Sequence, residues 1–294
     1  MQSMEKDKGA VLVTGASSGI GHACVLKFDQ AGYHVFAGVR KESDAESLRQ
    51  QASSRLTPVL LDVTNQALIA ATVSQVAEAV DETGLVGLVN NAGIAVPAPL
   101  EVIPLAELRQ QFEVNVIGQV ALTQALLPLL RKARGRIINV GSVGSSMIFP
   151  FAGALSASKA ALEAINDALR MELLPWGIHV ILITPSTIRT PGVDKLQHDS
   201  EELLRSIAEE DARRYAQPFR AFVKAFARQE EIGSPPEMVA EVILQALAAK
   251  TPRTEYPVGR GSRLLPLLAH MLPTSLLDKV RINALGLTRQ SETS

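Results

Sequence analysis

The chain has a single cysteine and almost no net charge. With Cys24 as its one thiol, it can form no intrachain disulfide and no cysteine-rich metal site. Its 29 basic and 30 acidic residues leave a net charge of −1, which favours neither nucleic acid nor an anionic membrane as the main partner. The five histidines lack metal-ligand spacing. We therefore expect no metal site and no nucleic-acid partner.

Long apolar runs are also missing. No stretch of about 18 uninterrupted apolar residues, the length of a membrane-spanning helix, occurs in the chain. The polar start, Met1–Lys8, lacks the apolar core of a signal peptide. These absences predict a cytoplasmic protein with no membrane-spanning segment. Hydrophobic residues still make up 47% of the sequence, enough for a large continuous core.

Short apolar runs alternate with longer helical patterns over roughly the first 190 residues. The runs predict strands at Ala10–Thr14, His34–Gly38, Pro58–Leu61, Gly87–Val89, Arg136–Val140 and His179–Ile183. The helical patterns lie at Ile20–Ala31, Ala67–Asp81, Leu105–Leu130 and Ala152–Leu174. Continuously apolar strands are typical of a sheet with helices on both faces. We therefore predict an α/β fold, a doubly wound, mostly parallel sheet of Rossmann type, with its ligand crevice at the carboxyl ends of the strands.

The remainder of the chain extends this fold without a visible linker, so we expect one domain over residues 1–294. Residues 9–190 form the cofactor and catalytic core, 191–235 a substrate-side lid, and 236–294 the C-terminal helices with a last strand at Glu255–Val258. The lid segment is highly charged, with apolar residues at helical spacing within Gln197–Arg228. The tail, Arg263–Leu287, is rich in leucine. We interpret it as a helix pair that packs on the domain or a neighbouring subunit; a membrane-surface or lid role is the alternative.

A glycine-rich turn joins the first predicted strand to the first helix. Glycine permits a sharp turn, a close approach of pyrophosphate and close packing of helix on strand, while the helix N-terminus offers free N–H groups to phosphate. The spacing is GxxxGxG instead of the usual GxGxxG. Its position between strand and helix nevertheless favours a dinucleotide site. The residues that we assign to it are Gly15, Ser17, Ser18, Gly19, Ile20 and Gly21.

Three further strand ends agree with a dinucleotide. Asp62-Val63 follows the third strand, where a carboxylate can accept from an adenine amino group. Asn91-Ala92-Gly93 follows the fourth and can line the adenosine side of the crevice. Pro185 follows the sixth and can form a rigid wall beside the nicotinamide.

The end of the second strand carries the residue that discriminates between NAD and NADP. An acid there would bind the ribose 2′-hydroxyl, but the run ends in Arg40-Lys41 and has no acid before Glu42. Arg40 can pair with a 2′-phosphate through charge-assisted hydrogen bonds. The alternative is that both cations are solvated loop residues. We favour NADP over NAD.

These features resemble the short-chain dehydrogenase/reductase family, strongly over about residues 9–190. The sequence of His34–Arg40 and the long C-terminal tail are similar to those of the branch that contains hydroxysteroid and retinol dehydrogenases. The motifs that carry the resemblance are Thr14–Gly21, Asn90–Gly93, Asn115–Gly118, Val140–Ser142 and Ser156–Lys159.

The resemblance implies hydride transfer between nicotinamide and a carbonyl or alcohol. By motif, Ser142 would bind the substrate oxygen, Lys159 the nicotinamide ribose, and Asn115 would hold a helix kink and a water leading to the lysine. Ile188 and Thr190, after Pro185, would contact the cofactor. A family tyrosine, whose pKa of about 10 the lysine lowers, would exchange the proton with substrate.

The tyrosine position, four residues before Lys159, holds Leu155. Leucine can neither donate nor accept a proton, and the three tyrosines of the chain lie elsewhere in sequence: Tyr33, Tyr215 and Tyr256. Three accounts are open. The chain is a dehydrogenase impaired by the replacement, a natural variant that reduces a conjugated enone or iminium without this phenol, or a non-catalytic dinucleotide-binding protein. We favour the first.

The substrate is expected to be hydrophobic. An apolar group flanks the proposed site and suits a steroid-like or retinoid-like carbonyl or alcohol, although ordinary core packing would explain each member equally well. Relatives commonly pair two long helices across a two-fold axis, so the resemblance implies a homodimer or homotetramer. The apolar group is Val143, Met147, Ile148, Phe149 and Phe151.

Overall fold

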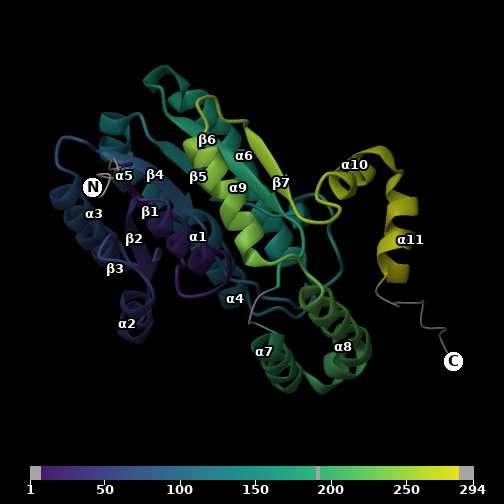
Figure 1. Cartoon of the computed structure of the whole chain (residues 1–294). Helices are drawn as coiled ribbons and strands as arrows, with labels where there is room; N and C mark the ends of the chain where they lie inside the picture. The colour runs from purple at the N-terminus through teal and green to yellow at the C-terminus, as the bar shows by residue number, and fades with distance from the viewer. Residues whose placement is uncertain (1–7, 190–192, 285–294) are drawn as a thin grey trace, which may run out of the picture.

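A seven-stranded, entirely parallel sheet organises the chain in a computed structural model, which describes residues 8–189 and 193–284 (Figure 1). The strand order is β3-β2-β1-β4-β5-β6-β7. The predicted doubly wound α/β fold is therefore confirmed, with strand ends shifted by one to two residues and the last strand in place. The strands are β1 Ala10–Val13, β2 His34–Val39, β3 Leu56–Leu60, β4 Leu85–Asn90, β5 Arg136–Val140, β6 His179–Pro185 and β7 Glu255–Val258.

Each face of the sheet has its own hydrophobic core because side chains alternate along a strand. In β1, Val11 and Val13 point into the core beneath α1 (Gly19–Gln30), α2 (Glu42–Gln51) and α9 (Pro236–Ala248). Ala10 and Leu12 point into the opposite core, covered by α3 (Gln66–Val80), α5 (Gly118–Ala133) and α6 (Gly153–Leu173). Two short 3₁₀ turns flank α6, at Val143–Ser145 and Leu174–Trp176. Every side chain of β1 is thus buried.

One helix prediction was wrong in detail, and one helix was missed. The single helix expected at Leu105–Leu130 is α4 (Leu105–Phe112), a π-helical turn at Glu113–Ile117 and α5. A π turn inserts one residue into the helical repeat, which the apolar periodicity alone does not reveal. Helix α2 was missed because its sequence is mostly charged and polar and only Ala45 and Leu48 are buried.

The continuous helical stretch 105–133 is long and apolar enough to cross a membrane by length and composition. Half of its most apolar window is buried within the protein. Helix α5 packs against β4 and α3. Its apolar character therefore has a role in covering the sheet.

Four helices lie beyond the carboxyl edge of the sheet. The predicted lid segment forms α7 (Val193–Ser206) and α8 (Glu209–Glu231), which pack against each other. The chain then returns through α9 and β7 to the sheet. It ends, in the described part, with α10 (Leu264–Met271) and α11 (Thr274–Ala284), drawn in yellow and set apart from the body of the domain in Figure 1. The predicted single domain with C-terminal helices is confirmed.

Candidate active site and cofactor cleft

The turn between β1 and α1 is shaped for close approach of a ligand. Gly15 and Gly19 adopt φ values of +66° and +55°, which favour glycine. A Cβ on Gly21 would lie 2.2 Å from the carbonyl oxygen of Gly15, so the helix and turn are packed without space for a side chain. Ser18 caps α1 in an extended conformation without a side-chain hydrogen bond, so no side chain caps the first-turn N–H groups. This cradle fits a pyrophosphate.

A cavity of about 320 Å³ opens above this turn, at the carboxyl ends of β1, β2 and β4. It brings together most of the predicted cofactor residues from four separate segments. Gly21 does not line it and instead positions the turn. The predicted residues that line it are Gly15, Ser17, Ser18, Gly19, Ile20, Arg40, Asp62, Val63, Asn91, Ala92 and Gly93.

Thr14 is a lining residue that the sequence reasoning passed over. Its hydroxyl accepts hydrogen bonds from the backbone N–H groups of Asn91 (2.9 Å) and Ala92 (2.8 Å), and thereby ties the end of β1 to the end of β4. Its place in the glycine motif was the available signal. The other lining residues that were not predicted are Gly38, Val39, Leu61, Thr64, Ile94, Gln110 and Val114.

Arg40 and Asp62 lie in the same cavity, where the second and third strands end. Arg40 is exposed and follows β2 directly. The carboxylate of Asp62 accepts from the backbone N–H (2.9 Å) and the hydroxyl (2.7 Å) of Thr64, which orients the side chain. The cavity therefore has a cation at one strand end and an oriented carboxylate at the next.

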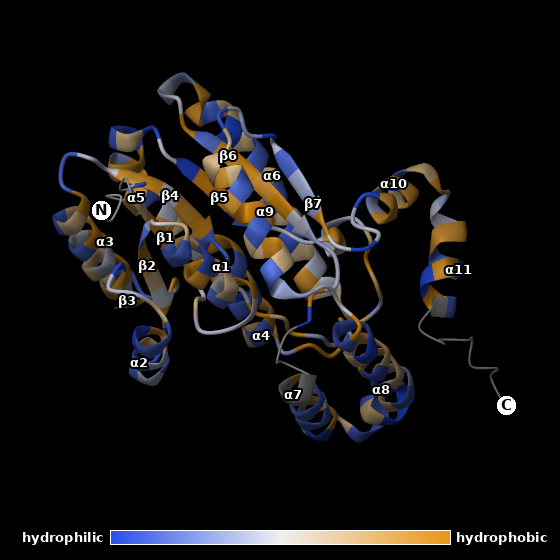
Figure 2. Cartoon of the chain, in the orientation of Figure 1, coloured by the Kyte–Doolittle hydropathy of each residue, from blue (hydrophilic) through white to orange (hydrophobic). Residues whose placement is uncertain are grey.

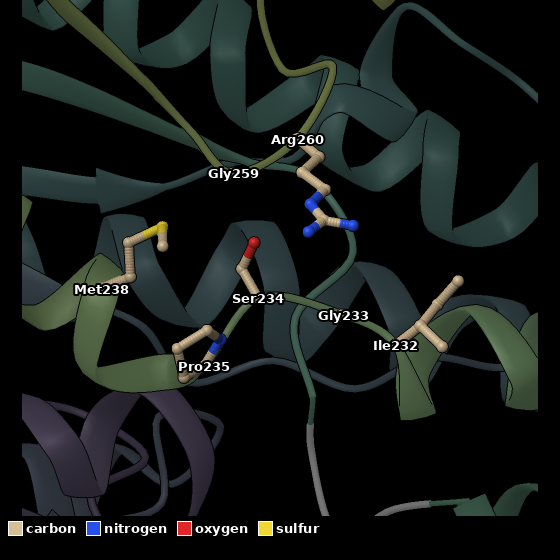
Figure 3. Close-up of a pocket in the computed structure, with 7 residues that line it drawn as sticks. All are labelled: Ile232, Gly233, Ser234, Pro235, Met238, Gly259 and Arg260. Carbon is tan, nitrogen blue, oxygen red and sulfur yellow. The ribbon is translucent and has the colours of Figure 1, made fainter.

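Pro185 and Ile188 lie outside this cavity, at the end of β6. Ile188 forms a parallel bridge with Ser234, and the backbone N–H of Ser186 donates to Val258 O at 2.8 Å. A second cavity of about 360 Å³ lies beside this segment, with Ser234 and Arg260 among its lining residues (Figure 3). Thr190 lies outside the described residues.

Ser142 and Lys159 are held near the end of β5. Ser142 caps a short 3₁₀ turn, and its hydroxyl accepts from the N–H of Gly144 at 3.0 Å. The ammonium of Lys159 donates to the carbonyl oxygen of Val140, 2.6 Å away. Burial lowers the pKa of Lys159 to about 8, because desolvation disfavours the charged amine. Both side chains therefore converge on residues 140–142.

Asn115 lies in the π turn and is almost fully buried. Its amide oxygen accepts from the N–H of Ile94 (2.8 Å), while its amide nitrogen donates to Ile94 O (3.0 Å) and to the hydroxyl of Ser158 (3.1 Å). Gln111, one turn earlier, also bonds Ile94 O and accepts from the N–H of Val96. The sequence analysis did not single out Gln111, and it named Ser158 only within the Ser156–Lys159 motif, although both are buried partners in the hydrogen bonds around the π turn.

Comparisons with known proteins agree with this site. A family model described as short chain dehydrogenase matches residues 9–201. The chain is 37% identical to an NADPH-dependent 3-dehydrocapnine reductase of Ornithobacterium rhinotracheale, over 92% of this chain and 94% of that protein. It is 35% identical to retinol dehydrogenase 5 of Mus musculus, over 95% and 89%. A short-chain dehydrogenase structure from Streptomyces avermitilis superposes with a TM-score of 0.72 at 29% identity, covering 94% of both chains.

The chain belongs to the short-chain dehydrogenase family. The resemblance inferred from the motifs is thus confirmed, and so is its position near the hydroxysteroid and retinol dehydrogenase branch. Membership establishes an NAD(P)-dependent oxidoreductase that transfers hydride to or from nicotinamide.

This short-chain dehydrogenase has no phenol where its motif expects one. Leu155 is half-buried on α6, one helical turn before Lys159. Tyr33 is buried in a core against Phe28, and the hydroxyl of Tyr256 accepts from the N–H of Arg253. Among the described interactions, no tyrosine bonds to Ser142 or Lys159.

Tyr215, on lid helix α8, is the one tyrosine near the substrate side. Its ring lies 6.5 Å, centroid to centroid, from Phe151. Its hydroxyl donates to the carboxylate of Glu101, and this hydrogen bond raises the pKa of Tyr215 above its usual value. A phenol already held by a carboxylate is a poor replacement for the missing acid.

The predicted apolar group divides into parts with different surroundings. Phe149 and Phe151 join the lid helices through a cluster that includes Phe219 and Phe222. Phe151 takes a left-handed φ of +66°, which is strained for a side chain of this size. Met147 is buried, whereas Ile148 is exposed. Aromatic packing therefore fixes the lid over the loop that follows Ser142.

Proposed function

We propose that this chain is an NADPH-dependent short-chain oxidoreductase for a hydrophobic carbonyl or alcohol, with redox activity impaired by Leu155. One observation carries the proposal: Ser142 and Lys159 are held beside residues 140–144, Asn115 bonds Ser158 next to Lys159, and the position one turn before Lys159 holds Leu155, which cannot exchange a proton. Eleven of the predicted cofactor residues line one cavity and Leu155 is not among its lining residues, so binding and chemistry are expected to be affected separately.

Each residue has a defined task in this proposal. Bound nicotinamide supplies the hydride exchange. The hydroxyl of Ser142 hydrogen-bonds the substrate oxygen and holds it beside α6. Lys159 binds the nicotinamide ribose through its ammonium. General acid–base catalysis typically contributes about 10²–10⁴-fold, so its loss at position 155 slows carbonyl reduction without abolishing cofactor binding.

The preference for NADP rests on Arg40. The guanidinium lies at the end of β2 within the cofactor cavity, and no acid in the strand opposes a 2′-phosphate. Among the described residues, Arg40 makes no ion pair that would occupy it. A relative with 37% identity is named as NADPH-dependent, which supports the same preference.

The hydrophobic substrate class rests on the lid. Phe149, Phe151 and the aromatic residues of α8 form one apolar cluster beside the proposed site. Such a wall favours an apolar ligand, and a similar protein is named for retinol. We also propose a homodimer or homotetramer, because the small side chains of Ala160 and Ala164 lie exposed one turn apart on α6. A cytoplasmic location is proposed from the sequence alone. Light scattering after gel filtration would measure the assembly.

Restoring the phenol tests the proposal. Leu155→Tyr should raise ketone reduction by about 10²–10⁴-fold, because it places a proton donor one turn from Lys159. Leu155→Phe is the matched control, since it adds the ring without the hydroxyl. NADPH oxidation would be measured for both variants and the parent chain on ketone and enone panels. A gain with Phe equal to that with Tyr would contradict proton donation.

The other accounts give different results in the same assay. Rapid enone or iminium turnover with Leu155 present would support a natural phenol-free reductase. Absence of turnover in every variant, with NADPH still bound in calorimetry, would support a non-catalytic binder. No binding of either dinucleotide would overturn the cofactor assignment itself.

Removing the Arg40 guanidinium tests cofactor preference. Arg40→Ala should weaken NADPH binding by about 10- to 100-fold and leave NADH binding within about twofold, because only NADPH carries the 2′-phosphate. Calorimetry measures both affinities. Arg253→Ala, another exposed arginine outside the cavity, is the control. Equal losses for the two dinucleotides would show that Arg40 does not recognise the phosphate.

A further inference from the structure

The C-terminal helices α10 and α11 both present exposed apolar side chains to solvent. On α10, exposed apolar residues recur at intervals of three and four, which places them on one helix face, and none of the eight residues of this helix is buried. Figure 2 shows both α10 and α11 with hydrophobic segments away from the main body. We call the tail surface the five side chains, 46% to 72% exposed, of Leu264, Leu267, Met271, Leu276 and Val280.

One residue of α11 anchors this surface to the domain. Leu277 is only 4% exposed, whereas its neighbour Leu276 and Val280, one turn later, face outward. The guanidinium of Arg281 donates to the carbonyl oxygen of Ser146, 3.3 Å away, in the loop that follows Ser142. Ile148 in that loop is 45% exposed. Helix α11, which carries part of the tail surface, is therefore bonded to the loop that follows Ser142.

The charge around the tail surface is opposite to that of the whole chain. Residues 259–283 contain four cations and a single acid, Asp278, although the chain as a whole has a net charge of −1. Arg263 lies one turn before Leu267, and Lys279 lies three residues after Leu276. Both are exposed. The apolar stripe is thus flanked by basic side chains, which is typical of helices that lie in a membrane interface. The four cations are Arg260, Arg263, Lys279 and Arg281.

We propose that the tail surface docks this protein on a membrane surface that contains anionic lipid. The leucine, methionine and valine side chains enter the boundary between headgroups and acyl chains, and Arg263 and Lys279 reach the anionic headgroups. A second copy on the same surface would oppose like charges, which is unfavourable. A bilayer satisfies the apolar and the basic side chains together.

Docking through the tail surface would bring the loop 143–152, which Arg281 contacts at Ser146, close to the lipid. Resting on the proposed function, this gives a hydrophobic substrate a route from the bilayer to Ser142 without passage through water. The near-zero net charge of the chain does not oppose it, because screening limits surface electrostatics to about 8 Å at physiological salt.

Vesicle binding of the full chain tests the apolar part. The chain should sediment with vesicles of phosphatidylcholine mixed with phosphatidylglycerol and bind pure phosphatidylcholine far less. The double variant Leu267→Ser/Met271→Ser should lose at least tenfold in binding. The matched control is Met171→Ser/Leu174→Ser, because those side chains, in the last turn of α6 and directly after it, are 62% and 65% exposed. Equal losses in both pairs would overturn the assignment of the surface.

The basic side chains are tested separately. Arg263→Gln and Lys279→Gln should each weaken binding to the anionic vesicles about fivefold, and high salt should have the same direction of effect. Arg253→Gln is the control. Binding that is insensitive to these changes and to lipid charge would overturn the anionic-lipid assignment.

Two further measurements keep the outcomes distinct. Calorimetry with NADPH should give the same affinity for the serine pair as for the parent chain, so failure of the cofactor proposal is detected independently. Light scattering follows assembly in the same variants. A serine pair that converts a dimer to a monomer without altering vesicle binding would assign the tail surface to a second copy and contradict docking on lipid.

Discussion

The cofactor end of the sheet and the C-terminal tail differ in the burial of their apolar side chains. Every residue of β1 is buried, and the neighbouring cavity is lined largely by glycine, small and polar residues. In α10 no residue is buried, and leucine faces solvent. The structure of the first region depends on backbone geometry. The second region consists of apolar side chains that the folded domain does not cover.

This difference indicates where substitutions are tolerated. At the turn, a single added carbon meets backbone, as at Gly21, so even alanine requires a movement of the chain. On the tail surface, an exposed leucine can be replaced without creating a cavity. Cofactor binding and membrane docking should therefore respond to separate sets of residues.

The largest expected effect on cofactor binding is at the glycine turn. Gly21→Ala should weaken NADPH binding by about 100-fold, because the new Cβ would lie 2.2 Å from Gly15 O and displace the cradle. Calorimetry measures the affinity. The control is Gly32→Ala, whose Cβ would meet nothing within 4 Å, although its φ of +87° costs some stability. An unchanged NADPH affinity in Gly21→Ala would show that the turn tolerates substitution as well as the tail surface does.

A smaller effect is expected at Lys159, which lies on α6 and bonds the end of β5. Because its pKa is lowered from 10.5 to about 8, the folded state binds fewer protons than the unfolded state between these values. The contribution of this group to stability is therefore least favourable below pH 8 and improves as the pH rises toward 10.5. Lys159→Met removes that penalty and should stabilise the protein by about 1–3 kcal/mol at pH 7.

Denaturant unfolding across this pH range provides the check. The advantage of Lys159→Met over the parent chain should shrink as the pH rises from 8 to 10.5. The variant also loses the hydrogen bond to Val140 O, which sets a constant offset. A difference that does not change with pH would show that the lysine is not desolvated as described.

The smallest expected effect is at Tyr215 on the lid. Tyr215→Phe removes an exposed hydrogen bond to Glu101 and should cost less than about 1 kcal/mol of stability. Residual NADPH oxidation should stay within about twofold of the parent value. Substitution of Phe222 would not be a suitable control, because this side chain is buried in the aromatic cluster. Loss of turnover in Tyr215→Phe would show that this phenol acts as the proton donor and that the lid contributes to the catalytic site.

Much of the fold and of the cofactor cleft could be predicted because both depend on local patterns. Continuous apolar runs indicated the six core strands, and eleven predicted cofactor residues lie in one cavity. Helix α2 escaped because a polar surface helix has a weak apolar pattern. The roles of Gln111 and Ser158 were missed because their hydrogen-bond partners are distant in sequence: Gln111 bonds the backbone of Ile94, and the hydroxyl of Ser158 accepts from the amide of Asn115.

The sequence by itself determined the parallel α/β fold, the glycine turn and the presence of leucine, Leu155, four residues before Lys159. Steric limits on φ and the spacing of apolar residues involve only a few neighbouring residues, so their effects can be predicted from the sequence. Tertiary structure alone decided the π turn that seats Asn115, the commitment of Tyr215 to Glu101 and the exposure of the tail surface. Those features depend on which distant segments meet, and burial of a leucine follows from what packs over it.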